Sequence, residues 1–488
     1  MNKYSLLLCL VLSGLLACSG KVEPGETVDA LPAIRPDYAG VTVPPNIAPL
    51  NFSVETPHTD AQVTFSGKNA DFTVREKNGQ FYIPARRWRG LLAGSAGDTV
   101  RATVRIKAET GWKEYAPFGI EVAKEPVDSY LAYRLIAPGY ELWDEMGIYQ
   151  RDLQSYAQQA IYETRMTQQN CVNCHSFCMQ NPEKMLFHMR DNFACTVLVD
   201  GDKIEKLDTK TGETMSPLVY PSWHPSGRFV AFSVNQTKQA FHTAHPNRVE
   251  VFDQASDVVV YDVQKHEIVT SPLLFSKGCF ETFPTFSPDG KTLYFCSAPA
   301  RAMPDEFEQV KYSLCSIAFD AETRTFGQTT DTLYNAVAGG KSASFPRVSP
   351  DGRYLLYTLS GYGNFSIWHK DADLYLADLH TLESKRLDRV NSDDVESYHS
   401  WSSNSRWFVF SSRRIDGLYT RPYIAYVDES GEVRKPFLLP QKETDFYFRS
   451  MQSYNIPEFI TGPVACNPYA VSRKVRNEAA IQVKSAFR

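Results

Sequence analysis

A fourfold internal repeat is the feature that most restricts the fold of this chain. The copies are "YPSWHPSGRFVAFSV" from Tyr220, "FPTFSPDGKTLYFCS" from Phe283, "FPRVSPDGRYLLYTL" from Phe345 and "YHSWSSNSRWFVFSS" from Tyr398. Within each copy, a turn such as Pro-Asp-Gly joins two strand-like runs, which predicts an antiparallel hairpin. Another strand-like run follows each hairpin. Repeats of this length and strand content predict the blades of a β-propeller, which must stack on one another to bury both faces.

The turns "SPDGK" and "SPDGR", each followed by a β-run, resemble the TolB-like six-bladed propeller family over about residues 185–465. Four blades are clear. A fifth is partial in "ACTVLVDGDKIEKLDTKTGE", and a sixth needs "DFYFRSMQSYNIPEF" together with a strand from elsewhere. The resemblance implies six blades, with five as the alternative. The turns themselves explain Asp289 and Asp351, so we expect no catalytic role for either residue.

The composition suits a mainly β protein with several domains. A chain of 488 residues is too long for one core, and its 13% aromatic content favours short strands over long helices. Apolar and aromatic residues spaced three and four apart predict a helix between Leu153 and Tyr162. The predicted divisions are 1–17 signal peptide, 18–39 tether, 40–125 β-sandwich of immunoglobulin-like size, 126–184 helical linker with the cysteine motif described below, 185–470 propeller and 471–488 basic tail.

The first residues predict export. Lys3 precedes the apolar run "SLLLCLVLSGLLA", which is too short for an ordinary membrane span. The run leads into "LLAC", which ends at Cys18 and resembles a bacterial lipobox. That resemblance implies cleavage before Cys18 and a lipid on its thiol, although an ordinary secretory signal would show a similar apolar run. No acidic run follows Cys18, so we expect a periplasm-facing lipoprotein rather than one displayed on the cell surface.

The segment "QQNCVNCHSFCMQ" carries the strongest chemical motif. Cys171, Cys174 and His175 match the c-type haem attachment pattern Cys-x-x-Cys-His, in which the thiols bond the porphyrin and the histidine ligates iron. The motif predicts one covalent haem c. Two alternatives remain: zinc held by these cysteines and Cys178 with His175 or His188, or a disulfide or free thiols.

A second iron ligand would have to come from elsewhere in the chain. His188 lies thirteen residues after His175 and is the favoured candidate, with His242 less favoured. Each could equally be a packed or hydrogen-bonded histidine. The surrounding segments, over about residues 130–470, resemble exported bacterial proteins that join this haem motif to a TolB-like propeller. Cys296 and Cys315, on strands predicted to be neighbours, are one candidate disulfide pair.

These observations predict a membrane-anchored lipoprotein that binds haem and acts in electron transfer or redox sensing, with the propeller as a docking scaffold for a protein partner. The alternative is a non-catalytic propeller scaffold or binding lipoprotein of the cell envelope, in which the cysteine motif is structural. The formal net charge of −5 and the lack of a basic stripe argue against nucleic acid as a partner. A hydrolase is disfavoured because the sequence has no Gly-x-Ser-x-Gly elbow and little length after residue 470.

Overall fold

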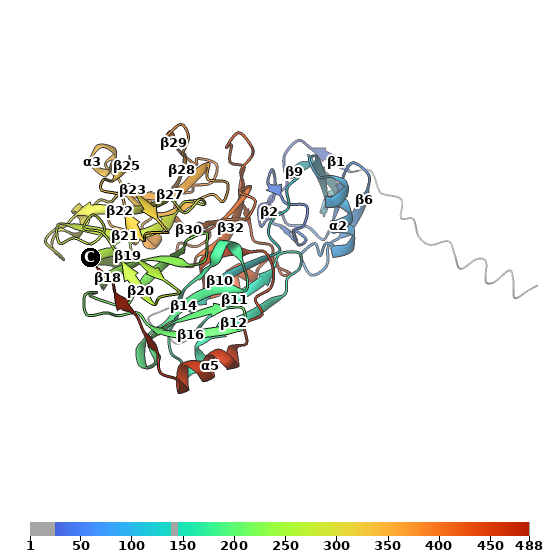
Figure 1. The fold of residues 1–488 in the computed structure, drawn as a ribbon. Helices are drawn as coiled ribbons and strands as arrows, with labels where there is room; N and C mark the ends of the chain where they lie inside the picture. The colour runs from blue at the N-terminus through green and yellow to red at the C-terminus, as the bar shows by residue number, and fades with distance from the viewer. Residues whose placement is uncertain (1–24, 138–144, 488) are drawn as a thin grey trace, which may run out of the picture.

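The computed structural model describes residues 25–137 and 145–487, and β-strands dominate it (Figure 1). Six sheets of four or five strands follow one another along the chain and form a six-bladed β-propeller, which confirms the predicted mainly β fold. A separate β-domain precedes the propeller. No helix in the described residues is long and apolar enough to cross a membrane.

Each blade is an antiparallel meander whose first-named strand below is the innermost. Blade 1 contains β34 (Ser453–Ile460), β10 (Tyr130–Ile136), β11 (Met146–Asp152) and β12 (Gln158–Glu163). Blade 2 contains β13 (Val172–Phe177), β14 (Lys184–Met189), β15 (Cys195–Asp200) and β16 (Lys203–Asp208). Blade 3 contains β17 (Val219–Trp223), β18 (Phe229–Phe241), β19 (Val249–Asp262) and β20 (Glu267–Val269).

The remaining blades follow the same plan. Blade 4 contains β21 (Cys279–Phe286), β22 (Thr292–Pro299), β23 (Ser313–Asp320), β24 (Thr325–Phe326) and β25 (Asp331–Tyr334). Blade 5 contains β26 (Ser342–Val348), β27 (Tyr354–Ser360), β28 (Asp373–Asp378) and β29 (Ser384–Arg386). Blade 6 contains β30 (Glu396–Trp401), β31 (Trp407–Ser412), β32 (Arg421–Tyr426) and β33 (Phe437–Leu438).

Blade 1 closes the propeller by joining its two ends. Strand β34, from the end of the propeller, pairs antiparallel with β10 at its beginning. Blade 1 is therefore the blade whose partial sequence "DFYFRSMQSYNIPEF" needed a strand from elsewhere in the chain. The helix predicted between Leu153 and Tyr162 is not formed, because β11 and β12 flank a turn there and Ile161 packs into the core between blades 1 and 2. Pairing within the sheet overrides the local helical spacing. The propeller accordingly begins near residue 130 rather than 185.

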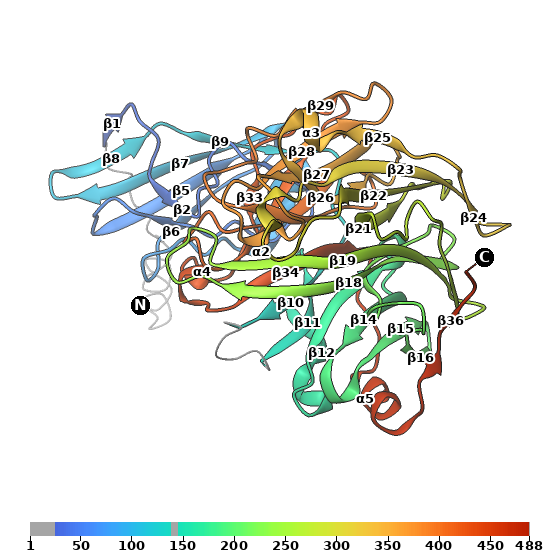
Figure 2. The same cartoon turned by 90° about the vertical axis from the view of Figure 1, so that its left-hand side faces the viewer.

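The basic C-terminal segment is docked on the propeller (Figure 2). Helix α5 (Pro468–Asn477) begins after Asn467, whose side chain accepts hydrogen bonds from the amides of Tyr469 and Ala470. Strands β35 (Ile481–Gln482) and β36 (Lys484–Ser485) then pair in parallel with β16 and β20, respectively. Val483, between them, is buried. The segment therefore ties the outer edges of blades 2 and 3 together.

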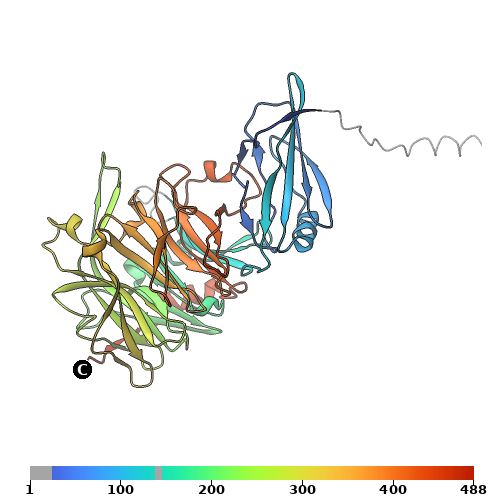
Figure 3. The same cartoon turned by 90° about the horizontal axis from the view of Figure 1, so that it is seen from above.

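The N-terminal β-domain lies beside the propeller (Figure 3). Its strands are β1 (Glu26–Val28), β2 (Ile34–Arg35), β3 (Thr42–Val43), β4 (Ser53–Val54), β5 (Asp60–Ser66), β6 (Asp71–Arg75), β7 (Thr99–Ala108), β8 (Gly111–Tyr115) and β9 (Phe118–Val122). Helix α2 (Ala85–Gly94) buries Trp88 against Phe65, with ring centroids 5.7 Å apart. The indole of Trp407 in blade 6 donates to the Glu125 carbonyl at 3.1 Å, and one apolar cluster spans both domains. The two domains are therefore packed together.

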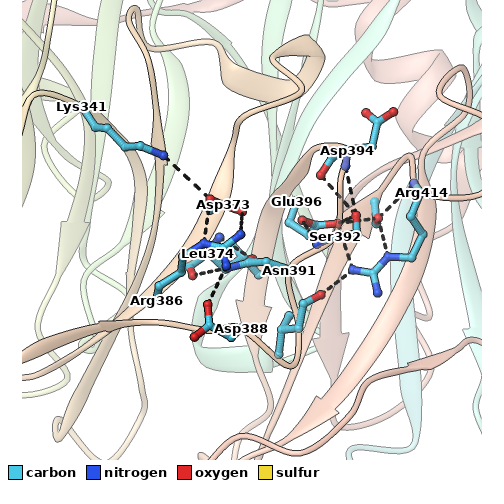
Figure 4. Close-up of polar contacts among 12 residues, drawn as sticks. Lys341, Asp373, Leu374, Arg386, Asp388, Asn391, Ser392, Asp394, Glu396 and Arg414 are labelled. Atoms are coloured by element: carbon cyan, nitrogen blue, oxygen red, sulfur yellow. Dashed lines mark hydrogen bonds and ion pairs between the residues drawn. The ribbon is translucent and has the colours of Figure 1, made fainter.

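A polar network fixes the connection between blades 5 and 6 (Figure 4). Both Nε and Nη2 of Arg386 donate to the Asp373 carboxylate at 2.9 Å. The fully buried carboxylate of Glu396, at the start of β30, accepts from Ser392 and from Arg414. Because a buried carboxylate is costly without such donors, the network holds the inner strand of blade 6 in place.

Candidate functional site at the channel mouth

The inner strand of every blade carries one residue with a positive φ angle. These residues are Cys174 (50°), Tyr220 (50°), Phe283 (50°), Phe345 (53°), Tyr398 (47°) and Ile456 (52°). The strand pairing shifts register at the same points. A positive φ is unfavourable for residues other than glycine, so its recurrence in all six blades marks a built-in bulge.

The bulge residues form a plug at the centre of the propeller. Ring centroids are 4.6 Å apart for Tyr220 and Phe283, 4.3 Å for Phe283 and Phe345, and 5.0 Å for Phe345 and Tyr398. Cys174 lies close enough to Tyr220 and Tyr398 to contribute to the raised pKa of both phenols, for which burial is the main cause. These contacts join the inner strands of blades 3 to 6.

The predicted haem motif is the blade 2 copy of the propeller repeat. Cys174 occupies the bulge position taken by Tyr220 in blade 3, and His175 occupies the position of Pro221. His399 in blade 6 replaces the same proline. The sequence concealed this copy because its aromatic residue and its proline are both substituted.

The surroundings of His175 and His188 show that the haem prediction is wrong. All six residues of β13 are buried. His175 faces blade 1, with Nε2 3.5 Å from Oε2 of Glu458, whereas the His188 ring lies 6.0 Å from Phe232 of blade 3. The two imidazoles point to opposite sides of blade 2, so they cannot ligate one iron. Cys174 is only 8% exposed, so its thiol lies within the packed strands.

The zinc and disulfide alternatives are not supported either. In residues 25–137 and 145–487, no three His, Cys, Asp or Glu side chains are grouped to hold a metal, and none of the cysteines forms a disulfide. Cys171 instead contacts Met146, with the two sulfur atoms 3.7 Å apart. Cys178 is buried in the apolar cluster between blades 2 and 3. The cysteine motif is therefore part of the packed core.

The other predicted residues lie apart from this strand. His242 follows β18 in a loop, where its ring is 5.5 Å from that of His245. Cys296 and Cys315 belong to different apolar clusters, because the pairing places Cys296 opposite Leu314 and the two thiols on opposite faces of blade 4. Cys18 lies outside the described residues.

A small cavity opens beyond the plug, on the face that carries the hairpin turns of the repeat. Its volume is 110 Å³. All six blades contribute to it the residue two positions after the bulge: Ser176, Ser222, Thr285, Arg347, Ser400 and Glu458. Two of the hydroxyl groups make bonds within the scaffold, since Ser222 donates to Thr285 at 3.4 Å and Ser400 to the Pro457 carbonyl at 2.8 Å. We call this cavity the channel mouth.

Arg347 and Glu458 are the two ionisable side chains that line the channel mouth. The Glu458 side chain is 21% exposed, yet its Oε2 atom is buried and has no hydrogen-bond partner. Burial raises the pKa of Glu458 to about 8, although the nearby Arg347 charge opposes the shift. Burial also lowers the pKa of Arg347. In the described residues no ion pair joins the two side chains, although each is the main opposite charge near the other.

Aromatic and amide side chains form the rim of the mouth. The indoles of Trp223 and Trp401 donate to the Ser176 and Arg347 carbonyls at 3.2 and 3.0 Å, which links each blade to the one before it. Gln180, after β13, reaches across to the Trp401 carbonyl. Met179, beside it, is 39% exposed. The rim is therefore held by cross-blade bonds.

Arg347 and Glu458 were not predicted from the sequence. The signal was present in "FPRV" and "IPEF", where the third residue is charged and the clear copies of the repeat otherwise carry Ser or Thr. Recognising it required all six copies to be aligned, and two of them were not recognisable before the structure showed the shared bulge.

Comparisons with known proteins do not assign this chain to a family. No family model and no curated protein matches the sequence. Similar solved structures include a DUF4784 family protein from Bacteroides caccae, with 9% identity, a TM-score of 0.34, and coverage of 83% of this chain and 95% of that one. Prolyl oligopeptidase B from Galerina marginata shows 10% identity and a TM-score of 0.35, over 69% of this chain and 42% of that chain. Because these TM-scores are low, the fold is assigned from the strand pairing alone.

Proposed function

We propose that this protein is a non-catalytic binding scaffold of the bacterial cell envelope, and that its ligand site is the channel mouth. The observation that carries the proposal is the pair Arg347 and Glu458, two ionisable side chains that line one cavity among residues with small hydroxyl groups. Concave sites with a few convergent polar groups are typical of ligand binding. Engaged hydroxyls such as that of Ser400 are suited to holding the scaffold rather than to attacking a substrate.

The N-terminal sequence supports the proposed location. In this proposal the chain is exported, cleaved before Cys18 and held on a membrane by the lipid on that residue, facing the periplasm. Strand β1 begins at Glu26, so only about eight residues separate the anchor from the folded β-domain. At roughly 3.5 Å per extended residue, the β-domain would lie within ~30 Å of the membrane. A protein partner in the same envelope would bind the propeller, which lies farther from the anchor than the β-domain does.

Hydrogen exchange of the mature protein tests the proposal. The protein is incubated with an envelope extract that has been separated into small-molecule and macromolecular fractions. We expect one fraction to slow exchange in the segments 176–182 and 457–460 at the mouth, and exchange in helix α3 (Ala336–Gly339), on the outside of blade 4, to stay unchanged. Protection that spares the mouth, or no protection by either fraction, would contradict a ligand site there.

A further inference from the structure

The C-terminal segment of the chain shows how an extended strand is held between two blades. The Lys484 amide donates to the His266 carbonyl at 2.9 Å. Two residues later, the Ala486 amide donates to the Ile268 carbonyl, also at 2.9 Å. Val483 enters the apolar cluster between blades 2 and 3. The segment is therefore held by backbone hydrogen bonds to the edge of a blade and by one apolar side chain, the wedge, that fills the gap between blades.

A groove lies between the outer strands of blades 4 and 5, and we call it the outer groove. Strands β25 and β29 border it (Figure 1). Its volume is 470 Å³, which is within the usual range of ligand sites. In the residues that the structure describes, no strand pairs with the outer edge of β29. The aromatic and apolar residues that line the groove are Tyr294, Leu314, Leu333, Tyr334, Tyr357, Ala377, Leu379 and Leu382.

The edge of blade 5 repeats the edge of blade 3. A tight turn precedes each outer strand, with φ angles of 54° at His266 and 60° at Leu382. Two residues after these positions, Ile268 lies in β20 and Ser384 lies in β29. A strand added to β29 as β36 is added to β20 would therefore meet the carbonyls of Leu382 and Ser384.

Smaller side chains leave the outer groove open. In blade 3, Tyr261 lies opposite Ile268 in the strand pairing, and both belong to the cluster that Val483 enters. The corresponding pair in blade 5 is Ala377 and Ser384. These two residues fill less space than tyrosine and isoleucine do, so the groove has room for a wedge larger than valine.

The rim of the outer groove is apolar and acidic. Leu382 is 72% exposed, and exposed apolar residues beside a groove are typical of docking sites. Both charged residues that line the groove, Asp331 and Asp378, are acidic. A basic residue beside the wedge complements this charge. The chain's own segment has this pattern, because Lys484 follows Val483.

We propose that the outer groove binds an extended segment of a partner protein. The segment adds to β29 as a strand, and its amides donate to the carbonyls of Leu382 and Ser384. A large apolar or aromatic wedge with a basic neighbour lies between blades 4 and 5. In this mode of recognition the backbone bonds give affinity and the side-chain pocket gives specificity. The groove is separate from the channel mouth, so this inference does not depend on the proposed role of the mouth.

Fluorescence anisotropy with the full mature chain and labelled peptides tests the inference. The probe is "AIQVKSAF", residues 480–487, with Val483→Phe as its wedge. We expect it to bind. Val483→Asp in the peptide should weaken binding by at least about tenfold, because a carboxylate is unfavourable in an apolar groove. Lys484→Pro, added to the Val483→Phe peptide, should weaken it by about fivefold or more, because proline lacks the amide that donates to the Leu382 carbonyl.

Variants of the protein give a second measurement. Leu382→Asp removes an apolar contact at the rim and should weaken binding of the Val483→Phe peptide by about fivefold or more. Leu31→Asp, which changes an exposed leucine of the β-domain, is the matched control and should bind as the unmodified chain does. Ala377→Tyr places in blade 5 the residue that blade 3 carries and should abolish binding by filling the groove.

Hydrogen exchange locates the bound peptide. We expect protection of segments 331–334 and 382–386, with 176–182 and 457–460 at the mouth unchanged. The inference is overturned if the peptide does not bind, if proline does not weaken it, or if it protects 266–269 by displacing the chain's own segment. Protection of the groove by a neutral oligosaccharide such as maltohexaose, without peptide binding, would identify a sugar site instead. The peptide series on the unmodified chain decides the question even if a variant does not fold.

Discussion

His175 is a neutral imidazole sealed inside the propeller. Its side chain has no exposed surface, and neither ring nitrogen has a hydrogen-bond partner. Burial lowers its pKa to about 3. Four blades carry proline at this position, so the site requires a compact side chain rather than a proton acceptor or a metal ligand. The pattern Cys-x-x-Cys-His falls where blade 2 carries Cys174 at the bulge position and His175 at the position of the proline.

The first prediction concerns His175→Leu and acid stability. Because the folded pKa lies below the unfolded value of about 6.5, the folded protein binds fewer protons, and stability is lost as pH falls below 6.5. Leucine cannot take up a proton. The variant should lose less stability between pH 7 and pH 5 than the unmodified chain does, by on the order of 1–2 kcal/mol, as measured by urea unfolding.

His188 and His399, whose pKa values are also lowered by burial, keep part of the pH dependence in that variant. His380→Leu, in an exposed turn, is the control. An equal loss of stability in His175→Leu and the control would mean that His175 is solvated or charged in the folded state.

At the scale of elements, the hairpin turns could be predicted from the sequence, but the partner of each strand could not. The turns at Asp289 and Asp351 carry enough local information to place β21–β22 and β26–β27 from the sequence. Strands β11 and β12 lack such turns, and their aromatic spacing imitates a helix. Their identity depends on pairing with β10 and on the neighbouring blade, which are contacts that no local pattern encodes. The same reason hid the blade 2 copy of the repeat.

The second prediction concerns the C-terminal strands. Val483 lies in the apolar cluster between blades 2 and 3, while β35 and β36 on either side of it pair with those blades. Val483→Asp places a carboxylate in this cluster and should destabilise the fold by roughly 2–4 kcal/mol. The measurement is the shift of the urea midpoint. Lys484→Asp, which changes an exposed neighbour, should shift it far less, and a similar shift in both variants would argue against a docked segment.

At the scale of the whole molecule, closure of the propeller determines what the chain can do. Strand β34 brings Glu458 into the ring opposite residues that lie more than a hundred positions earlier, and only the closed ring gathers Arg347, Glu458 and the four hydroxyl residues around one cavity. The sequence could predict the propeller from its repeats. It could not predict the mouth, because the mouth depends on six bulges that come into register only after closure.

The segment from Cys171 to Phe177 is a packed blade strand and not an attachment site for haem. The most direct test is the intact mass of the mature protein produced in a bacterium that has the c-type haem maturation system. The structure predicts a mass equal to the polypeptide with any N-terminal lipid and nothing further on Cys171 or Cys174. A mass increase equal to one haem, lost in Cys174→Ala, would show that the segment does attach haem.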